Sequence, residues 1–170
     1  ADLQRYRQET KTECLIAMNT TNKNYDCLEL ADNVISCSPD EVQLVMQAFQ
    51  LLHSGSGIIG MDWNEVKWAI SSGRNIEFLH GMASGENCVA LACEQLIPKL
   101  KNLSSNYPIK NVMINMYADI SFGCEQQDFI IKQIDKNLMV KDATTFCQLS
   151  FFDEFDYWKK GEQGCCICMF

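Results

Sequence analysis

The stretch Lys110-Asn111-Val112-Met113-Ile114-Asn115-Met116-Tyr117 carries the clearest fold signal in this sequence. Its centre, Val112-Met113-Ile114, is apolar at every position, which is typical of a strand buried on both faces of a sheet. Helical patterns flank it over about 86–100 and over Glu125–Lys136. Strands that alternate with helices in this way predict an α/β domain whose helices pack on a sheet.

The same alternation continues in both directions along the chain. Further predicted elements are a helix over Asp62–Ser72 and strands over Ile76–Met82, Thr145–Phe152 and Cys165–Phe170. We therefore predict an α/β fold of the two-layer α+β kind, with a mixed four-stranded sheet packed with helices. The last two strands are expected to form an antiparallel hairpin connected by Asp153–Gln163.

Prolines and capping residues predict where the helices begin and end. Ser38-Pro39-Asp40-Glu41 combines an N-cap residue, a proline suited to the first helical position and two acids at the positive end of the helix dipole. Because Leu28–Ile35 also has a helical pattern, we predict a helix pair ahead of the sheet. Pro98 should end or kink the 86–100 helix, since proline has no N–H to donate. Lys101–Pro108 is expected to be a polar loop.

The length of 170 residues suits a single domain. Residues 1–12 show no core-facing stripe and are expected to be a tail or a short surface helix. Residues 13–170 are expected to form the domain. Within this domain, residues 13–57 are expected to form a strand at Cys14–Met18 and a central helix. Residues 58–170 are expected to form the sheet and its helices.

Composition limits the classes of partner. Fourteen Lys and Arg against 22 Asp and Glu give a formal net charge of −8, so the chain repels phosphate backbones and no nucleic-acid partner is expected. The apolar fraction of 47% and the charged fraction of 21% are those of a globular domain. No apolar run approaches the ~20 residues of a membrane-spanning helix, so no membrane span is expected.

The ten cysteines bear on the cellular compartment. Six stand singly in apolar stretches and are expected to be small buried hydrophobic residues, namely Cys14, Cys27, Cys37, Cys88, Cys93 and Cys147. Because the first twelve residues are polar and charged, they do not resemble a secretory signal, and we expect a reducing cytoplasm. An exported, disulfide-bonded protein is the alternative.

The remaining chemistry-bearing residues do not form a catalytic or metal motif. Cys165-Cys166-x-Cys168 is closely spaced, but zinc needs four ligands and no second Cys or His pair lies nearby in the sequence. In a strand, 166 and 168 face one side and 165 the other, which favours a core strand. The two histidines, His53 and His80, lie in no motif. We therefore expect no metal, no cofactor and no catalytic residue.

Three segments, in order and spacing, point to a family. They are Gly57–Val66 (GIIGMDWNEV), Gly81–Asn87 (GMASGEN) and Asn111–Asp119 (NVMINMYAD). Together they resemble the C-terminal domain of FtsZ, the bacterial tubulin-like cell-division protein. That family has a central helix, a loop bearing Asn-x-Asp-x-x-Asp, a Gly-x-Ala-x-Gly-Glu turn that opens a helix, and a Val-Asn-Ile-Thr-like strand. The resemblance runs from about residue 13 to the end and implies the same fold.

The resemblance also implies what this chain does not do. The family binds GTP through an N-terminal domain with a Gly-Gly-Gly-Thr-Gly-Ser-Gly loop, which is not found in this sequence. Ser54-Gly55-Ser56-Gly57 follows a predicted helix, whereas a phosphate-binding loop precedes one, so it is expected to be a helix end and turn. We therefore expect a domain without GTPase activity that is not an enzyme.

The family's Asn-x-Asp-x-x-Asp loop completes the GTPase site of the next subunit in a filament. The matching positions here are Gly60, Asp62 and Glu65, so one acid is kept, one is longer by a methylene and the amide is absent. The resemblance implies that Asp62, Trp63 and Glu65 contact a protein partner. The alternative is that Asp62 caps the helix and Glu65 completes a capping box, and both can hold at once.

A second candidate surface is Phe151–Trp158, in which five aromatic residues alternate with three acids. Exposed aromatic residues next to charges are typical of protein-binding patches, which makes Phe155, Tyr157 and Trp158 candidates for partner contacts. The alternative is that Phe151 and Tyr157 pack within the hairpin and the acids are solvated.

Two functions fit these observations best. The first is a protein-interaction domain related to the FtsZ C-terminal domain, which binds or modulates a filament-forming partner. The second is an adaptor or specialised chaperone that uses the same fold on an unrelated client protein. A small thiol-based enzyme is a third alternative, and a homo-oligomer is also left open.

Overall fold

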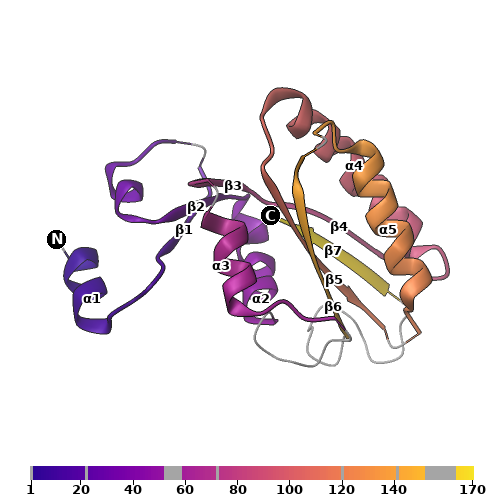
Figure 1. Cartoon of the computed structure of the whole chain (residues 1–170), viewed down its shortest axis with the longest axis horizontal. Helices are drawn as coiled ribbons and strands as arrows, with labels where there is room; N and C mark the ends of the chain where they lie inside the picture. The colour runs from indigo at the N-terminus through magenta and orange to yellow at the C-terminus, as the bar shows by residue number, and fades with distance from the viewer. Residues whose placement is uncertain are drawn as a thin grey trace.

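The computed structural model describes residues 2–21, 23–51, 59–71, 73–119, 121–140, 142–151 and 164–170. The helices are α1 (Asp2–Thr10), α2 (Val42–Leu51), α3 (Trp63–Ser71), α4 (Cys88–Asn106) and α5 (Cys124–Asn137), with 3₁₀ turns η1 (Asp26–Leu30) and η2 (Pro39–Glu41). The strands are β1 (Ile16–Asn19), β2 (Asn33–Ser36), β3 (Asn75–Glu77), β4 (Leu79–Ser84), β5 (Asn111–Ala118), β6 (Thr144–Phe151) and β7 (Gly164–Met169). Figure 1 shows their arrangement.

The predicted mixed four-stranded sheet is confirmed, with strand order β4-β7-β5-β6. Strands β5 and β6 are parallel, and β7 is antiparallel to both of its neighbours. The predicted hairpin between the last two strands is wrong, because β5 lies between β6 and β7. Backbone pairs with β4 on one edge and with β5 on the other occupy both edges of β7, so no free edge is left for β6 to pair with.

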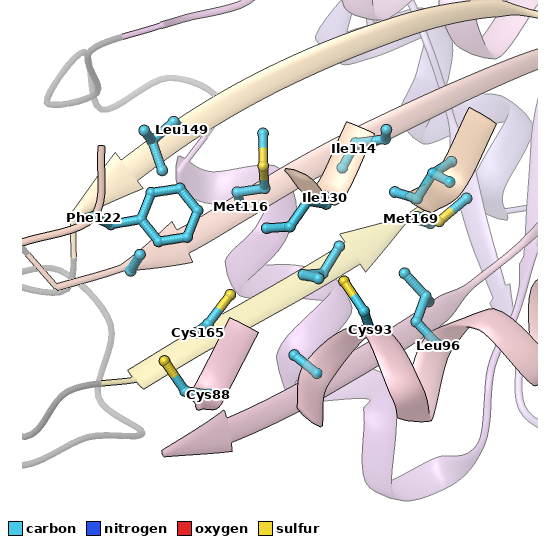
Figure 2. Packing of buried hydrophobic residues seen from close by; sticks show 14 of the residues in the cluster. Cys88, Cys93, Leu96, Ile114, Met116, Phe122, Ile130, Leu149, Cys165 and Met169 are labelled. Atoms are coloured by element: carbon cyan, nitrogen blue, oxygen red, sulfur yellow. The ribbon is translucent and has the colours of Figure 1, made fainter. Parts of the chain in front are cut away.

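Helices α4 and α5 cover one face of this sheet (Figure 1). Figure 2 shows Cys93 and Leu96 of α4 pointing toward the strands, with Cys165 and Met169 on β7. Ile130 of α5 joins the same cluster and is completely buried. The helical spacing predicted over about 86–100 and 125–136 therefore describes real core-facing stripes.

Helices α2 and α3 cover the opposite face. Val45 and Ala48 of α2 pack with Ile70 of α3 against the sheet, where Cys166 of β7 is completely buried. The buried hydroxyl of Tyr117 on β5 donates a hydrogen bond to the carbonyl of Ala48 at 3.1 Å. With helices on both faces, the interior strands are buried on both sides, as the apolar run in β5 predicts.

A second, three-stranded parallel sheet with order β1-β2-β3 corrects the predicted helix pair. Leu28–Ile35 is not a helix: the turn η1 is followed by strand β2. The buried Asn33 amide donates to the carbonyls of Ile70 at 2.7 Å and Gly73 at 2.8 Å, which ties β2 to the end of α3. These long-range hydrogen bonds stabilise a strand at Asn33–Ser36 although the local pattern favours a helix, since tertiary contacts commonly outweigh helix propensity.

Other differences from the predicted elements concern their ends. Pro98 does not end α4, which continues to Asn106, so the predicted loop over Lys101–Pro108 is wrong over most of its length. The helix continues because Leu100 is completely buried against the sheet, which compensates for the missing N–H. The predicted strand Ile76–Met82 is divided between β3 and β4, which belong to different sheets.

The N-terminal residues form the exposed helix α1, whose Arg7 makes an ion pair with Asp32 at 2.9 Å. Within the described residues, no helix combines the length and the apolar character that a membrane crossing requires.

The close contact between β4 and α4 gives a test of the fold. A Cβ atom at Gly81 would lie 2.0 Å from the carbonyl oxygen of Ala92, whereas one at Gly60 would meet nothing within 4 Å. We expect Gly81→Ala to lower the free energy of unfolding by about 1–3 kcal/mol or more, since α4 must move away from the sheet. Gly60→Ala is the control and should stay close to the unmodified protein in urea unfolding. Equal stability of the two variants would contradict this packing.

Candidate functional site

The loop that leads into α3 is anchored at both ends. Ile59 forms an isolated antiparallel bridge with Leu149 of β6, and the Leu149 amide donates to the Ile59 carbonyl at 3.0 Å. Met61 is buried, with 7% of its surface exposed. The segment from 59 to 65, called the loop from 59 to 65 below although it includes the first turn of α3, is therefore held against the edge of the four-stranded sheet.

Asp62 and Glu65 form the capping box that their spacing predicts. The backbone N–H of Glu65 donates to Oδ1 of Asp62 at 2.8 Å, and the N–H of Asp62 donates to Oε2 of Glu65 at 2.8 Å. Each carboxylate thus satisfies one N–H that the helix start would otherwise leave without a partner. Both residues are exposed, and one backbone hydrogen bond holds each carboxylate in place.

Trp63 lies differently from the two acids. It is half-buried and packs against the cluster of Met61, Val66 and Met113. Its indole therefore stabilises the loop and presents only part of its surface. Gly60, which stands where the resembled family has asparagine, is exposed and has open space at its Cβ position. The loop can accept a larger residue there without displacing a neighbour.

The other proposed partner-binding residues lie outside the described part of the chain. They are Phe155, Tyr157 and Trp158. His53 and the glycine-rich stretch Ser54–Gly57, which is predicted to be a helix end and turn, also lie outside the described residues. Their predicted roles stay predictions.

His80 on β4 faces a carboxylate. Its Nδ1 lies 3.0 Å from Oε1 of Glu41, its ring stacks on Phe78 with centroids 5.8 Å apart, and Lys99 donates to its carbonyl at 3.3 Å. Burial and the charge of Lys99 lower the pKa of His80, and Glu41 opposes them. These contacts place η2 against β4 and α4, which is a structural role.

The cysteines are free thiols, and most are buried. Cys166 and Cys168 lie on the α2 face with their sulfur atoms 3.6 Å apart, and Cys165 lies on the α4 face, as predicted. Burial raises the pKa of Cys93 and of Cys147 to about 11, which disfavours the reactive thiolate. Of the six cysteines predicted to be buried, Cys27 is exposed, and Cys14 and Cys147 are only half-buried.

Across the residues that the structure describes, no three His, Cys, Asp or Glu side chains are grouped so that they would hold a metal ion.

The sequence gives no sign of a cleft that lies between the two sheets, with a volume of about 840 Å³. Its walls include Arg74 and β3 on one side, and Leu103 and Lys110 on the other. These residues are far apart in the chain and form no motif.

Comparisons with known proteins show what this fold is similar to. No protein-family model and no curated protein sequence matches the chain. Among solved structures, the FtsZ W319Y mutant of M. jannaschii has a TM-score of 0.63 at 12% identity, covering 83% of this chain and 47% of the FtsZ chain. The empty FtsZ dimer of M. jannaschii has a TM-score of 0.59 at 10% identity, covering 84% and 46%. The chain therefore has an FtsZ-like fold and spans about half the length of these structures.

Thiol exposure provides a test that separates structural from reactive cysteines. Cys27 and Cys124 are exposed and should react first with a chromogenic disulfide reagent, whereas the buried Cys93, Cys165 and Cys166 should react only as the protein unfolds. Mass spectrometry of the labelled peptides identifies the sites. A buried thiol that reacts faster than Cys27 would contradict the structural role and support a thiol-based enzyme.

Proposed function

We propose that this FtsZ-like domain acts by binding another protein through the loop from 59 to 65, and that an FtsZ-like filament subunit is its partner. The observation that carries the proposal is the capping box, which fixes the exposed carboxylates of Asp62 and Glu65 in place. Pre-oriented charges favour recognition because little side-chain entropy is lost when a partner binds.

The same geometry supports binding over catalysis. Each acid already accepts a backbone hydrogen bond from the other residue, which leaves one oxygen each for a partner. No amide stands at Gly60 to help position a water molecule, and small displacements at such sites cost much activity. We therefore propose a non-enzymatic protein, in which the loop serves as a contact surface.

The choice of partner rests on the fold. One of the similar structures is an FtsZ dimer, in which two subunits contact each other. A domain with that shape could meet such a subunit through the same loop and change filament assembly. A second copy of this chain is the other partner that the fold suggests.

The alternative function is an adaptor or specialised chaperone that binds an unrelated client. The observation that favours it is the alternation of aromatic residues and acids over Phe151–Trp158, which is typical of binding patches. In this case the client would contact Phe155, Tyr157 and Trp158.

A charge-removing double variant tests the loop. Asp62→Ser with Glu65→Gln keeps an N-cap residue and a capping-box partner but removes both charges, so its stability should change by only ~0.5 kcal/mol. We expect excess unmodified protein to change the amount of FtsZ that sediments with GTP, and the double variant to need at least about tenfold more protein for the same effect. If neither protein alters sedimentation or GTPase rate, the proposal for an FtsZ partner is wrong.

A gain-of-function variant sharpens this test. Gly60→Asn with Glu65→Asp restores the Asn-x-Asp-x-x-Asp pattern, and the open space at Gly60 accommodates the new side chain. We expect it to raise the GTPase rate of the partner above that measured with the unmodified protein. Gly60→Ala is the matched control. Equal rates for both variants would show that the loop does not reach a partner's nucleotide.

The adaptor alternative has its own test. If Phe151–Trp158 binds a client, Trp158→Ala should weaken the complex by about tenfold or more, because truncated aromatic anchors commonly cost 2 kcal/mol or more. Pull-down with the purified client and thermal unfolding of the variant would be measured together. Intact binding by a folded variant would exclude this patch.

A further inference from the structure

The cleft between the two sheets lies where a strand that continued β7 would run. Strand β7 ends with Met169 paired to Leu79 of β4 on one side and to Ile114 of β5 on the other. Beyond it, the chain of β4 leads back through Phe78 into β3, while β5 begins at Asn111. The cleft lies between these two segments, and Figure 1 shows the end of β7 close to β3.

One wall of this cleft is an open strand edge. The amide of Val34 donates to the carbonyl of Arg74 at 2.8 Å, and the amide of Phe78 donates to Ser36 at 3.1 Å. Because backbone groups alternate along a strand, the N–H and C=O groups of Asn75 and Glu77 point away from β2. In the part of the chain that the structure describes, these four groups have no hydrogen-bond partner. An unpaired edge is a template for another strand.

The opposite wall is mostly apolar. Leu103 near the end of α4 lines it, followed by Tyr107, which is 64% exposed, and Ile109, with Lys110 beside them. The volume of about 840 Å³ lies within the range of roughly 300–1,000 Å³ that is typical of ligand sites. The cleft thus combines hydrogen-bonding groups on one wall with an apolar surface on the other.

The charged side chains around the cleft favour an acidic occupant. Lys23, Arg74 and Lys110 line it, against the acids Glu29 and Glu77, in a chain whose net charge is −8. Arg74 donates one N–H to the carbonyl of Leu28 at 2.5 Å, and a guanidinium carries five such donors. A carboxylate can therefore form a charge-assisted hydrogen bond with Arg74 without disturbing this contact.

We propose that the cleft binds an extended peptide segment of a partner protein, which adds a strand to β3. Its backbone pairs with Asn75 and Glu77, its alternate apolar side chains contact Leu103 and Tyr107, and a carboxylate lies near Arg74. This is the β-augmentation mode of peptide recognition. A second copy of the chain is the less favourable occupant, since two copies that each carry a net charge of −8 repel each other.

This site is separate from the loop of the proposed function. Asp62 lies at the start of α3 and Arg74 follows its end, and a helix of nine residues at about 1.5 Å per residue separates them. The two proposals can therefore fail independently, because variants at one end of α3 leave the other end intact.

The test uses a blocked peptide of alternating valine and glutamate, added to the isotope-labelled full chain and followed by NMR. We expect saturable binding, with the amides of Asn75 and Glu77 shifting and exchanging more slowly with solvent. The amide of Val34, already bonded to Arg74, should change little. Methylation of alternate peptide nitrogens removes the paired N–H groups and should abolish binding, and replacing glutamate by lysine should weaken it.

A charge reversal tests the role of the cation. Arg74→Glu should weaken binding of the glutamate peptide about tenfold or more, since hydrogen bonds to charged groups are among the stronger ones. Lys101→Glu, on an exposed residue of α4 outside the cleft, is the matched control and should bind as the unmodified protein does. Thermal unfolding of both variants verifies that they fold.

Three outcomes would overturn the proposal. The first is the absence of any shift at Asn75 and Glu77 with millimolar peptide. The second is binding that methylation and Arg74→Glu leave unchanged, which would place the peptide elsewhere. The third is a dimer in which these two amides are already protected without peptide, which would make a second copy the occupant. None of these outcomes depends on FtsZ sedimentation.

Discussion

Strand β7 forms backbone pairs along both of its edges and buries side chains on both of its faces. All six of its residues, Gly164–Met169, are buried. Cys165 and Ile167 pack under α4 and α5, whereas Cys166 and Cys168 pack under α2 and α3. Full burial of an Ile-sized side chain stabilises a fold by about 1.5–3 kcal/mol, so this short strand joins both halves of the core.

The position of β7 also determines where the open surfaces lie. Strand β7 lies between β4 and β5, so β6 is at the edge of the sheet. Leu149 of this edge strand is therefore available to pair with Ile59. That bridge holds the loop whose acids cap α3. Past the end of β7, where Phe170 still pairs with Met113, the cleft lies beside β3. The candidate loop and the cleft thus follow from one arrangement of strands.

Local sequence signals were reliable where a single element determines the outcome. The capping box of Asp62 and Glu65 depends on three-residue spacing alone, and the structure has both of its hydrogen bonds. The apolar run Val112–Ile114 identified an interior strand, and the alternation in Cys165–Cys168 identified its two faces. These features depend on the periods of helices and strands, which are properties of neighbouring residues.

By itself, the sequence determined the alternation of elements, the faces that they bury and the caps that begin them, since each depends on contacts within a few residues. Only the tertiary structure decided which strands are neighbours. The insertion of β7, the strand at Asn33–Ser36 in place of a helix and the continuation of α4 past Pro98 all depend on bonds or packing between distant residues. The cleft was also decided by the tertiary structure alone. Its walls come from separate parts of the chain, and no local sequence pattern predicts that they lie close together.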